Sequence, residues 1–311
     1  MDFFPPAPNP DVPATMPPEG FSAVDAPWVL HAKSYTFVYG APSSSAPTPS
    51  AEAILSNPHN TPETLRGLPA GVYYPTEAVH PEVLLDATSG GPQLANTWLS
   101  CVMILHYENT PVGPYDELIL IPAAMKNPHT TETALRCTSM FVSNHGSLYN
   151  GRRNWNIPKA LARFEFTKLD GSRERVRVFH HPDSTLPTGI DISKPFFSAV
   201  ITTSSIPAIP IPRFTFPPLI QPPLALHPGE EKYPWVSVRP KYKGKWGLTW
   251  GSADTDEGSA GPTFGDGISF PAMSLYSAGV YFEGELAFGP GQRESGFGAG
   301  SGKTETDKKV D

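Results

Sequence analysis

The chain has 311 residues, of which 39% are hydrophobic and 17% charged, and its formal net charge is -7. This composition is typical of a globular protein with a sizeable core. The negative charge argues against an extended phosphate-binding surface, because nucleic-acid binding needs clustered Lys and Arg. No apolar run approaches the roughly 18 residues of a membrane span. We therefore expect neither a nucleic-acid partner nor a membrane association.

Both ends of the chain are predicted to lie outside the folded domain. Residues 1–26 hold many prolines and no periodic pattern, which predicts an extended or disordered arm. Residues 289–311 are Gly-rich and charged and are predicted to form a disordered tail. The first residues lack the basic and apolar segments of a signal peptide, so a cytoplasmic location is expected. A single domain is predicted over residues 27–288.

The region between the two ends is predicted to consist mostly of strands. Apolar or alternating runs predict strands over residues 31–39, 97–107, 117–123, 138–143, 162–169, 172–179, 196–203, 235–238, 242–250 and 274–288. A short helix is predicted over residues 51–57. The runs 97–107 and 117–123 are joined by a loop of Pro, Gly and Asn and predict a hairpin with a long connection. Asp170-Gly171 joins two alternating runs and is a strong signal for a second hairpin. With 38 prolines in the chain, long helices are not expected. The prediction is a mainly β, mainly antiparallel domain with a few short helices, arranged as a barrel or a two-sheet sandwich.

Three further segments have simple structural interpretations. The basic runs RERVR, at 173–177, and KYKGK, at 241–245, alternate with other residues, as on the solvated faces of strands. The proline-rich but apolar residues 206–224 are predicted to run extended over the body of the domain. Cys101 and Cys137 lie in apolar contexts, which favours buried thiols over a disulfide.

Several motif-like stretches fail on inspection. GAGSGKT at 298–304 lacks the first glycine of a P-loop, since Phe297 stands there, and a polar tail follows it. His106-Tyr107-Glu108 imitates part of a zinc deaminase motif, but no Pro-Cys-x-x-Cys completes it. The histidines show no HExxH spacing. The sequence therefore predicts no metal site and no cofactor.

Lys159, in the segment GRRNWNIPKALARFEF, is the candidate catalytic residue. Pro158 fixes its own φ angle and restricts the residue before it, which stiffens the backbone at the lysine. The neighbouring side chains are apolar, namely Trp155, Ile157, Ala160 and Leu161. Apolar surroundings disfavour an ammonium relative to the free amine, and the free amine is a nucleophile towards carbonyl groups. The alternative is a lysine that extends from a loop into water.

The segment resembles the active-site segment of the acetoacetate decarboxylase family, GRxxxx(Y/F)PKK, in which the first lysine forms a Schiff base. The matching residues are Gly151, Arg152, Ile157, Pro158 and Lys159. A second match is Tyr115-Asp116-Glu117, since the family carries Tyr-x-Glu before an apolar strand. A third, weaker match is Lys33, at a place where the family has an arginine. The likeness covers residues 27–166 with interruptions.

The resemblance implies the antiparallel barrel or sandwich of this family and a lyase reaction on a keto acid through an iminium on Lys159. Glu117 would then move protons. Arg152 or Lys33 would hold the substrate carboxylate, although a structural salt bridge for Arg152 and a surface position for Lys33 are the alternatives. Tyr115 and Trp155 would form walls. The resemblance also implies a homo-oligomer.

Two departures from the family keep other functions open. Ala160 stands where the family's decarboxylases have a second lysine, and Val102 stands where counting back from Glu117 places a second acidic residue. The first hypothesis is a decarboxylase acting on a keto acid, for example an intermediate of specialised metabolism. An aldolase or dehydratase on the same scaffold and a non-catalytic binder of an apolar small molecule are the alternatives. A structural module that offers the proline-rich arm to a partner is a further one.

Overall fold

The computed structural model describes residues 20–39, 71–75, 77, 94–95, 100–127, 133–184, 186, 189–224 and 235–294. The helix predicted over residues 51–57 and most of the two predicted terminal segments lie outside this set. Within it, no helix is both long and apolar enough to span a membrane.

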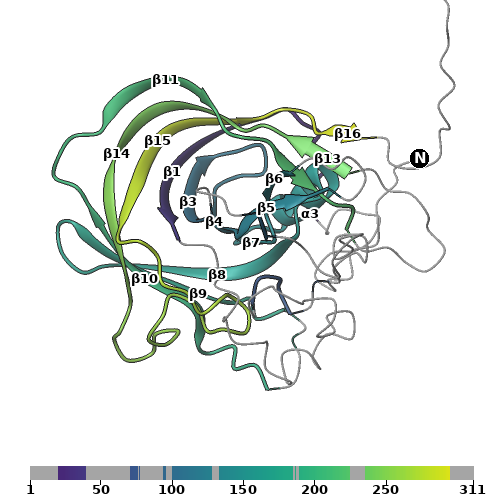
Figure 1. Ribbon diagram of the computed structural model, residues 1–311. Helices are drawn as coiled ribbons and strands as arrows, with labels where there is room; N and C mark the ends of the chain where they lie inside the picture. The colour runs from purple at the N-terminus through teal and green to yellow at the C-terminus, as the bar shows by residue number, and fades with distance from the viewer. Residues whose placement is uncertain are drawn as a thin grey trace, which may run out of the picture.

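The larger sheet has ten strands and closes into a barrel (Figure 1). In spatial order they are β10 (Pro195–Thr203), β9 (Arg173–His180), β8 (Lys159–Lys168), β7 (Ser139–Val142), β4 (Tyr115–Ile121), β3 (Cys101–Asn109), β1 (Trp28–Val38), β15 (Ala278–Phe288), β14 (Lys241–Ala253) and β11 (Ile209–Thr215). A further pairing between β10 and β14 closes the ring and leaves β11 outside it. Neighbouring strands are antiparallel except β7 and β8. The predicted mainly antiparallel β domain is confirmed.

A second sheet and one helix complete the described part of the chain. The sheet contains β16 (Gln292–Glu294), β13 (Trp235–Val238), β12 (Leu219–Gln221), β6 (Thr133–Arg136), β5 (Ala123–Lys126) and β2 (Leu94–Ala95). Helix α3 (His145–Trp155) packs against β7, β8 and β13 and lies beside β13 in Figure 1. Strand β16 belongs to the segment predicted as a disordered tail. That prediction is wrong for its three residues, because the edge of β13 offers them backbone partners.

The two predicted hairpins are both present. β3 and β4 pair antiparallel, and Gly113, at φ 87°, turns the loop between them. β8 and β9 pair without a shift in register. In their turn the Asp170 carboxylate accepts hydrogen bonds from the backbone N–H groups of Ser172, at 3.0 Å, and Arg173, at 2.9 Å. The aspartate of Asp-Gly therefore stabilises this turn through its side chain.

Strands β3 and β4 are buried on both faces over Cys101–Leu105 and Glu117–Ile121. Met103, Leu105 and Ile119 belong to one hydrophobic cluster, together with the apolar residues of α3. The residues between them in sequence belong to a second cluster, which includes Val102 and Leu118. Because side chains alternate along a strand, each of these buried residues faces one of two separate cores. The face that a residue occupies decides whether it can reach α3.

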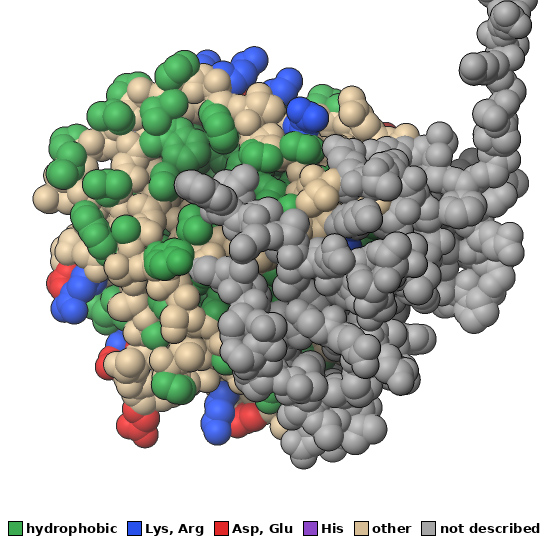
Figure 2. Space-filling model, viewed as in Figure 1, with side chains coloured by type: hydrophobic (Ala, Val, Ile, Leu, Met, Phe, Trp, Pro, Cys, Tyr) green, Lys and Arg blue, Asp and Glu red, His purple; other side chains and the backbone are tan. Residues whose placement is uncertain are grey.

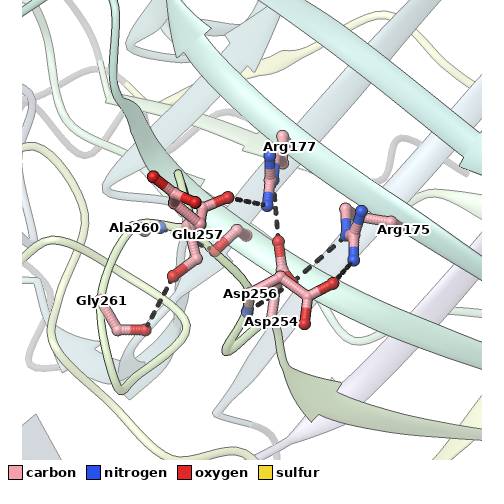
Figure 3. A network of polar contacts seen from close by, with 9 residues as sticks. Arg175, Arg177, Asp254, Asp256, Glu257, Ala260 and Gly261 are labelled. Carbon is pink, nitrogen blue, oxygen red and sulfur yellow. Dashed lines mark hydrogen bonds and ion pairs between the residues drawn. The ribbon is translucent and has the colours of Figure 1, made fainter.

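The basic run on β9 is solvated only in part, which corrects the expectation for residues 173–177, because Arg173 is exposed whereas Arg175 and Arg177 are half-buried. Arg177 Nε donates to Asp254 Oδ2 at 2.8 Å, and Arg175 Nε lies 3.2 Å from Asp254 Oδ1 (Figure 3). Asp254 is buried, and Arg177 also donates to the backbone oxygen of Glu257 at 3.0 Å. The two arginines thus fasten the loop that follows β14 to the barrel. On β14, by contrast, the three lysines of the second basic run are exposed as expected.

Two smaller expectations are also confirmed. Cys101 and Cys137 are buried free thiols, and burial raises the pKa of Cys101 to about 12 and also raises that of Cys137. The proline-rich residues 206–224 run extended, as strands β11 and β12.

Candidate active site

The turn at the end of α3 brings Lys159 back against this same helix. Asn144 caps the start of the helix, where its side chain accepts the backbone N–H of Ser147 at 3.1 Å. Asn156 ends the helix in a left-handed conformation at φ 53°, which asparagine tolerates better than most residues. The chain then reverses and enters β8 at Lys159, so the lysine side chain lies against α3.

The amine of Lys159 is buried and has two polar contacts. The side chain is 4% exposed, and Nζ lies 2.8 Å from Glu117 Oε2 and 2.9 Å from Ser147 Oγ. The ring of Tyr115 lies beneath it, with its centroid 5.4 Å from Nζ. The structure therefore brings together Lys159 and Glu117, the two residues that the sequence assigned to catalysis.

Gly151 provides the space that the lysine side chain occupies. A Cβ atom at this position would lie 2.5 Å from both Cδ and Cε of Lys159 and 3.2 Å from Nζ. Ser147 precedes Gly151 by one helical turn and faces the same side. Ser147 was not predicted as a site residue, although the spacing of four between Ser147, Gly151 and Trp155 places all three on one helix face.

The carboxylate of Glu117 is held from its other side by Tyr107. The Tyr107 hydroxyl donates to Glu117 Oε1 at 2.9 Å, and the carboxylate is 2% exposed. Burial, with the nearby Glu117 charge, raises the pKa of the Tyr107 and Tyr115 hydroxyls well above their usual values. Both therefore remain protonated, and Tyr107 remains a hydrogen-bond donor. Tyr107 was not predicted as a site residue.

Arg152 forms a salt bridge instead of lining the cavity. Its Nη1 and Nη2 atoms lie 2.7 Å and 3.1 Å from the two carboxylate oxygens of Glu77, and both side chains are 3% exposed. Nη1 also donates to the backbone oxygen of Lys159 at 3.1 Å. This is the structural alternative that the sequence left open. Arg152 positions the backbone of Lys159, and a substrate carboxylate would have to displace Glu77 to reach it.

Lys33 does not reach this site, which contradicts its predicted role. Its Nζ lies 2.7 Å from Glu108 Oε1 and its side chain is 40% exposed. Leu30 and Ala32 on the same strand are buried in the cluster that contains Trp155. Because side chains alternate, Lys33 faces away from that cluster.

The two positions at which the chain departs from the family also face away from the amine. Val102 and Ala160 both belong to the second hydrophobic cluster, on the opposite face from Glu117 and Lys159. A charged side chain at either position would be buried among apolar residues. The apolar residues at these two positions therefore suit the core of this protein and do not remove charges from the surroundings of Lys159 Nζ.

A small cavity lies next to the amine. Its volume is about 10 Å³, enough for one water molecule, and Lys159 and Glu117 supply its charged groups among the described residues. Tyr115 and Trp155 lie in its wall, together with Trp28, Leu30, Met140, Ile157 and Phe288. Trp155 packs between Trp28 and Phe288, at ring-centroid distances of 5.3 Å and 5.4 Å.

One group among the described residues has the composition of a metal site. One ligand atom each of His145, His181 and Asp183 lies within 4.8 Å of the others. Two imidazoles and a carboxylate would suit zinc. The group lies at the start of α3 and after β9, and none of its members lines the cavity at Lys159. No local motif indicates it, since His145 is distant along the chain from His181 and Asp183.

No protein-family model and no curated protein matches the chain. Several solved structures are similar to it, among them the following three. One is acetoacetate decarboxylase from Legionella pneumophila subsp. pneumophila str. Philadelphia 1, at 11% identity and a TM-score of 0.49, covering 90% of this chain and 93% of that chain. A second comes from structural studies of acetoacetate decarboxylase, at 11% and 0.47, covering 87% and 90%. The third is an acetoacetate decarboxylase-like enzyme from Sphingomonas wittichii RW1, at 15% and 0.45, covering 90% and 98%.

All three bear the name of the family that the sequence resembles. Identities and TM-scores this low say nothing about the chemistry of the site, which depends on the contacts described above.

Proposed function

We propose that this protein is a carbon–carbon lyase, a decarboxylase acting on a keto acid, in which Lys159 forms a Schiff base with the substrate. One observation carries the proposal. The Lys159 amine lies 2.8 Å from a buried carboxylate, beside a cavity whose other described walls are mainly apolar and aromatic. An amine that reacts with a carbonyl group needs a proton acceptor and shelter from water, and this arrangement supplies both.

Glu117 is the proton acceptor that would make the amine reactive. Transfer of one proton from Lys159 Nζ to Glu117 converts an ion pair into a neutral amine and a neutral carboxylic acid. Buried surroundings favour neutral groups over charged ones, so the transfer carries a smaller penalty here than in water. Ser147 and Tyr107 keep the two groups in place during the transfer, at 2.9 Å each. No second lysine is required for this step.

The reaction then follows from imine chemistry. The Nζ lone pair adds to the carbonyl carbon, and Glu117 returns its proton to the carbonyl oxygen. The Glu117 carboxylate then takes a second proton from the nitrogen and passes it to the same oxygen, which leaves as water to give an iminium. In a β-keto acid the electron pair of the bond to the carboxylate moves towards the iminium nitrogen, which releases carbon dioxide and leaves an enamine. Protonation of the enamine carbon and addition of water release the ketone and restore Lys159.

The apolar walls favour the loss of carbon dioxide. A substrate carboxylate in this cavity would carry a full charge among Trp28, Trp155 and Phe288. That charge is neutralised as the bond breaks, because its electrons move onto the cationic iminium. The described lining offers no cation besides Lys159 to hold the carboxylate in its ground state. The surroundings therefore favour the transition state over the bound acid.

Borohydride trapping tests the proposal. The protein is incubated with a panel of β-keto and α-keto acids, reduced with borohydride, digested and mapped by mass spectrometry. We expect at least one acid to leave a reduced adduct on the peptide that contains Lys159, and we expect none on this peptide in Lys159→Met. Adducts confined to exposed lysines, in equal amounts in both proteins, would refute the proposal. The released product separates decarboxylation, which gives carbon dioxide, from aldol cleavage or dehydration, which use the same iminium.

A second candidate function is supported by the size of the cavity. A volume of about 10 Å³ admits no keto acid unless a wall moves. A protein whose walls stay closed would be a non-catalytic binder of an apolar small molecule at another surface. Native mass spectrometry of the purified protein would detect a retained ligand, and a retained ligand without any turnover would favour this candidate.

A further inference from the structure

A large groove lies on the other side of the wall that encloses Lys159. Its volume is about 710 Å³, which is within the range of small-molecule sites. Strands β1, β11, β13, β14 and β15 contribute to it. Figure 2 shows Lys and Arg side chains along the upper edge of the molecule, where Figure 1 places β11 and β14.

The groove is strongly basic. Arg213, Arg239, Lys241 and Lys243 line it, against the single carboxylate of Glu285 among the described lining residues. Within the described part of the chain none of the four cations takes part in an ion pair, whereas Arg152, Arg175 and Arg177 all do. Four cations on one concave surface create a positive potential that attracts anions. In a protein of net charge -7, this local excess runs against the overall balance.

The groove and the cavity share part of their lining. Trp28 and Phe288 belong to both, so these two aromatic side chains form the wall between them. Trp155 connects the two sides as well, because its Nε1 donates to the backbone oxygen of Gly289, a groove residue, at 2.9 Å. A ligand in the groove therefore lies against the same aromatic group that closes the cavity at Lys159.

We propose that the groove binds a second anionic group of the substrate, a carboxylate or a phosphate, at the end remote from the reacting carbonyl. The carbonyl end then reaches Lys159 when the wall of Trp28 and Phe288 opens. This inference rests on the proposed function and narrows its substrate to a keto acid with a distal anionic group. It also supplies the cations that the cavity lacks, since Arg152 is bound to Glu77 and Lys33 to Glu108.

Anion binding tests the groove without any chemistry at Lys159. Benzene tricarboxylate and pyrophosphate are titrated by calorimetry into the native protein, Lys159→Met, the double variant Arg239→Gln/Lys241→Gln, and Lys245→Gln. Lys245 lies on β14 near Lys243, is exposed, and does not line the groove, so it is the matched control. We expect the first two proteins and the control to bind alike and the double variant to bind about tenfold more weakly or worse. The tighter of the two probes identifies the group as carboxylate or phosphate.

Trapping then links the groove to the reaction. A homologous series of methyl-ketone carboxylates that begins with levulinate, each beside its methyl ester, is reduced onto Lys159 with borohydride. We expect one chain length at which the acid is trapped about tenfold faster than its ester. The double variant should lose this preference, and Lys245→Gln should keep it.

The outcomes separate the two claims. Failure of both anions to bind, or equal trapping of acid and ester at every length, would overturn the groove as a substrate site and leave the Schiff base standing. Anion binding without any adduct on Lys159 would refute the proposed function and, with it, the assignment of the groove to this substrate. Thermal unfolding of each variant confirms that the substitutions leave the fold intact.

Discussion

Two buried ion pairs lie side by side at the start of β8. They differ in how the cation engages its carboxylate and in whether the cation can lose a proton. The Arg152 guanidinium engages both oxygens of Glu77, at 2.7 Å and 3.1 Å, and also the backbone oxygen of Lys159. The Lys159 ammonium engages one oxygen of Glu117, at 2.8 Å, while Tyr107 takes the other. An arginine stays protonated in proteins, whereas a lysine can lose its proton to a neighbour. One pair therefore fixes the backbone, and the other can react.

Removing the arginine should have the largest effect on stability. In Arg152→Met, the Glu77 carboxylate would remain buried without its bidentate partner, and we expect a loss of about 4 kcal/mol in the free energy of unfolding. In Lys159→Met, Glu117 keeps the Tyr107 hydroxyl and can take up a proton, so the expected loss is about 2 kcal/mol. Chemical denaturation measures both.

The double variant Lys159→Met/Glu117→Leu sharpens the contrast, because apolar replacement of both partners is nearly neutral for stability. The double variant should recover most of the free energy of unfolding that Lys159→Met loses. It should remain inactive. Equal losses in the two single variants would remove the distinction between a structural and a reactive pair.

A buried base without a charged partner provides a reference for both pairs. The ring nitrogens of His180 lie 3.1 Å from Tyr74 Oη and 3.1 Å from Ser269 Oγ, and burial lowers its pKa from 6.5 to about 4. The unfolded chain therefore binds a proton that the folded chain does not. The contribution of His180 to the free energy of unfolding is fully present above pH 6.5 and falls by about 3 kcal/mol as the pH drops to 4.

Denaturation at several pH values measures this loss. The free energy of unfolding should depend less steeply on pH in His180→Gln than in the native protein. An unchanged slope would show that other groups carry the acid dependence.

The glycine beside the lysine offers a test that affects the reactive pair alone. Alanine usually stabilises a helix by about 1 kcal/mol relative to glycine. In Gly151→Ala the new methyl group would overlap Cδ and Cε of Lys159, so we expect a net loss of about 2 kcal/mol and slower trapping of carbonyl probes. Gly171→Ala is the control, since a Cβ at that position meets nothing within 4 Å. A stabilised, fully reactive Gly151→Ala would contradict the described path of the lysine side chain.

The smallest effect is expected at the hydroxyl that holds Glu117. Tyr107→Phe removes one buried hydrogen bond of 2.9 Å and should lower the free energy of unfolding by about 1 kcal/mol. Glu117 would then be less well positioned. The rate of iminium formation in Tyr107→Phe should therefore fall more than the affinity of this variant for a ketone. Stopped-flow absorbance with an aromatic ketone separates the two quantities. A loss in affinity alone would assign Tyr107 to substrate binding.

The sequence predicted the β-rich fold and both hairpins because these depend on local signals. Alternating runs and the Asp170-Gly171 turn are each contained in a few neighbouring residues. The strand β16 was missed for the opposite reason. Its residues have no strand pattern of their own, and they pair with β13 only because that edge is adjacent in space.

The candidate site was predicted in part. Lys159 and Glu117 could be identified from short motifs, but the face that each residue occupies depends on the register of β1, β3 and β8. That register separates Lys33 and Val102 from the amine and brings Tyr107 to Glu117. Ser147 required the helix to be recognised first. The partner of Arg152, Glu77, is distant in sequence and could not be assigned from any local pattern.

Exchange of ketone oxygen with solvent tests the reactive lysine most directly. A ketone that forms and loses an iminium exchanges its carbonyl oxygen with isotopically labelled water, and mass spectrometry follows this exchange without any need for the natural substrate. We predict that the native protein accelerates the exchange for a small set of ketones, that Lys159→Met does not, and that Glu117→Gln is slowed by about a hundredfold. Exchange at the uncatalysed rate in the native protein, across ketones that it demonstrably binds, would contradict the account.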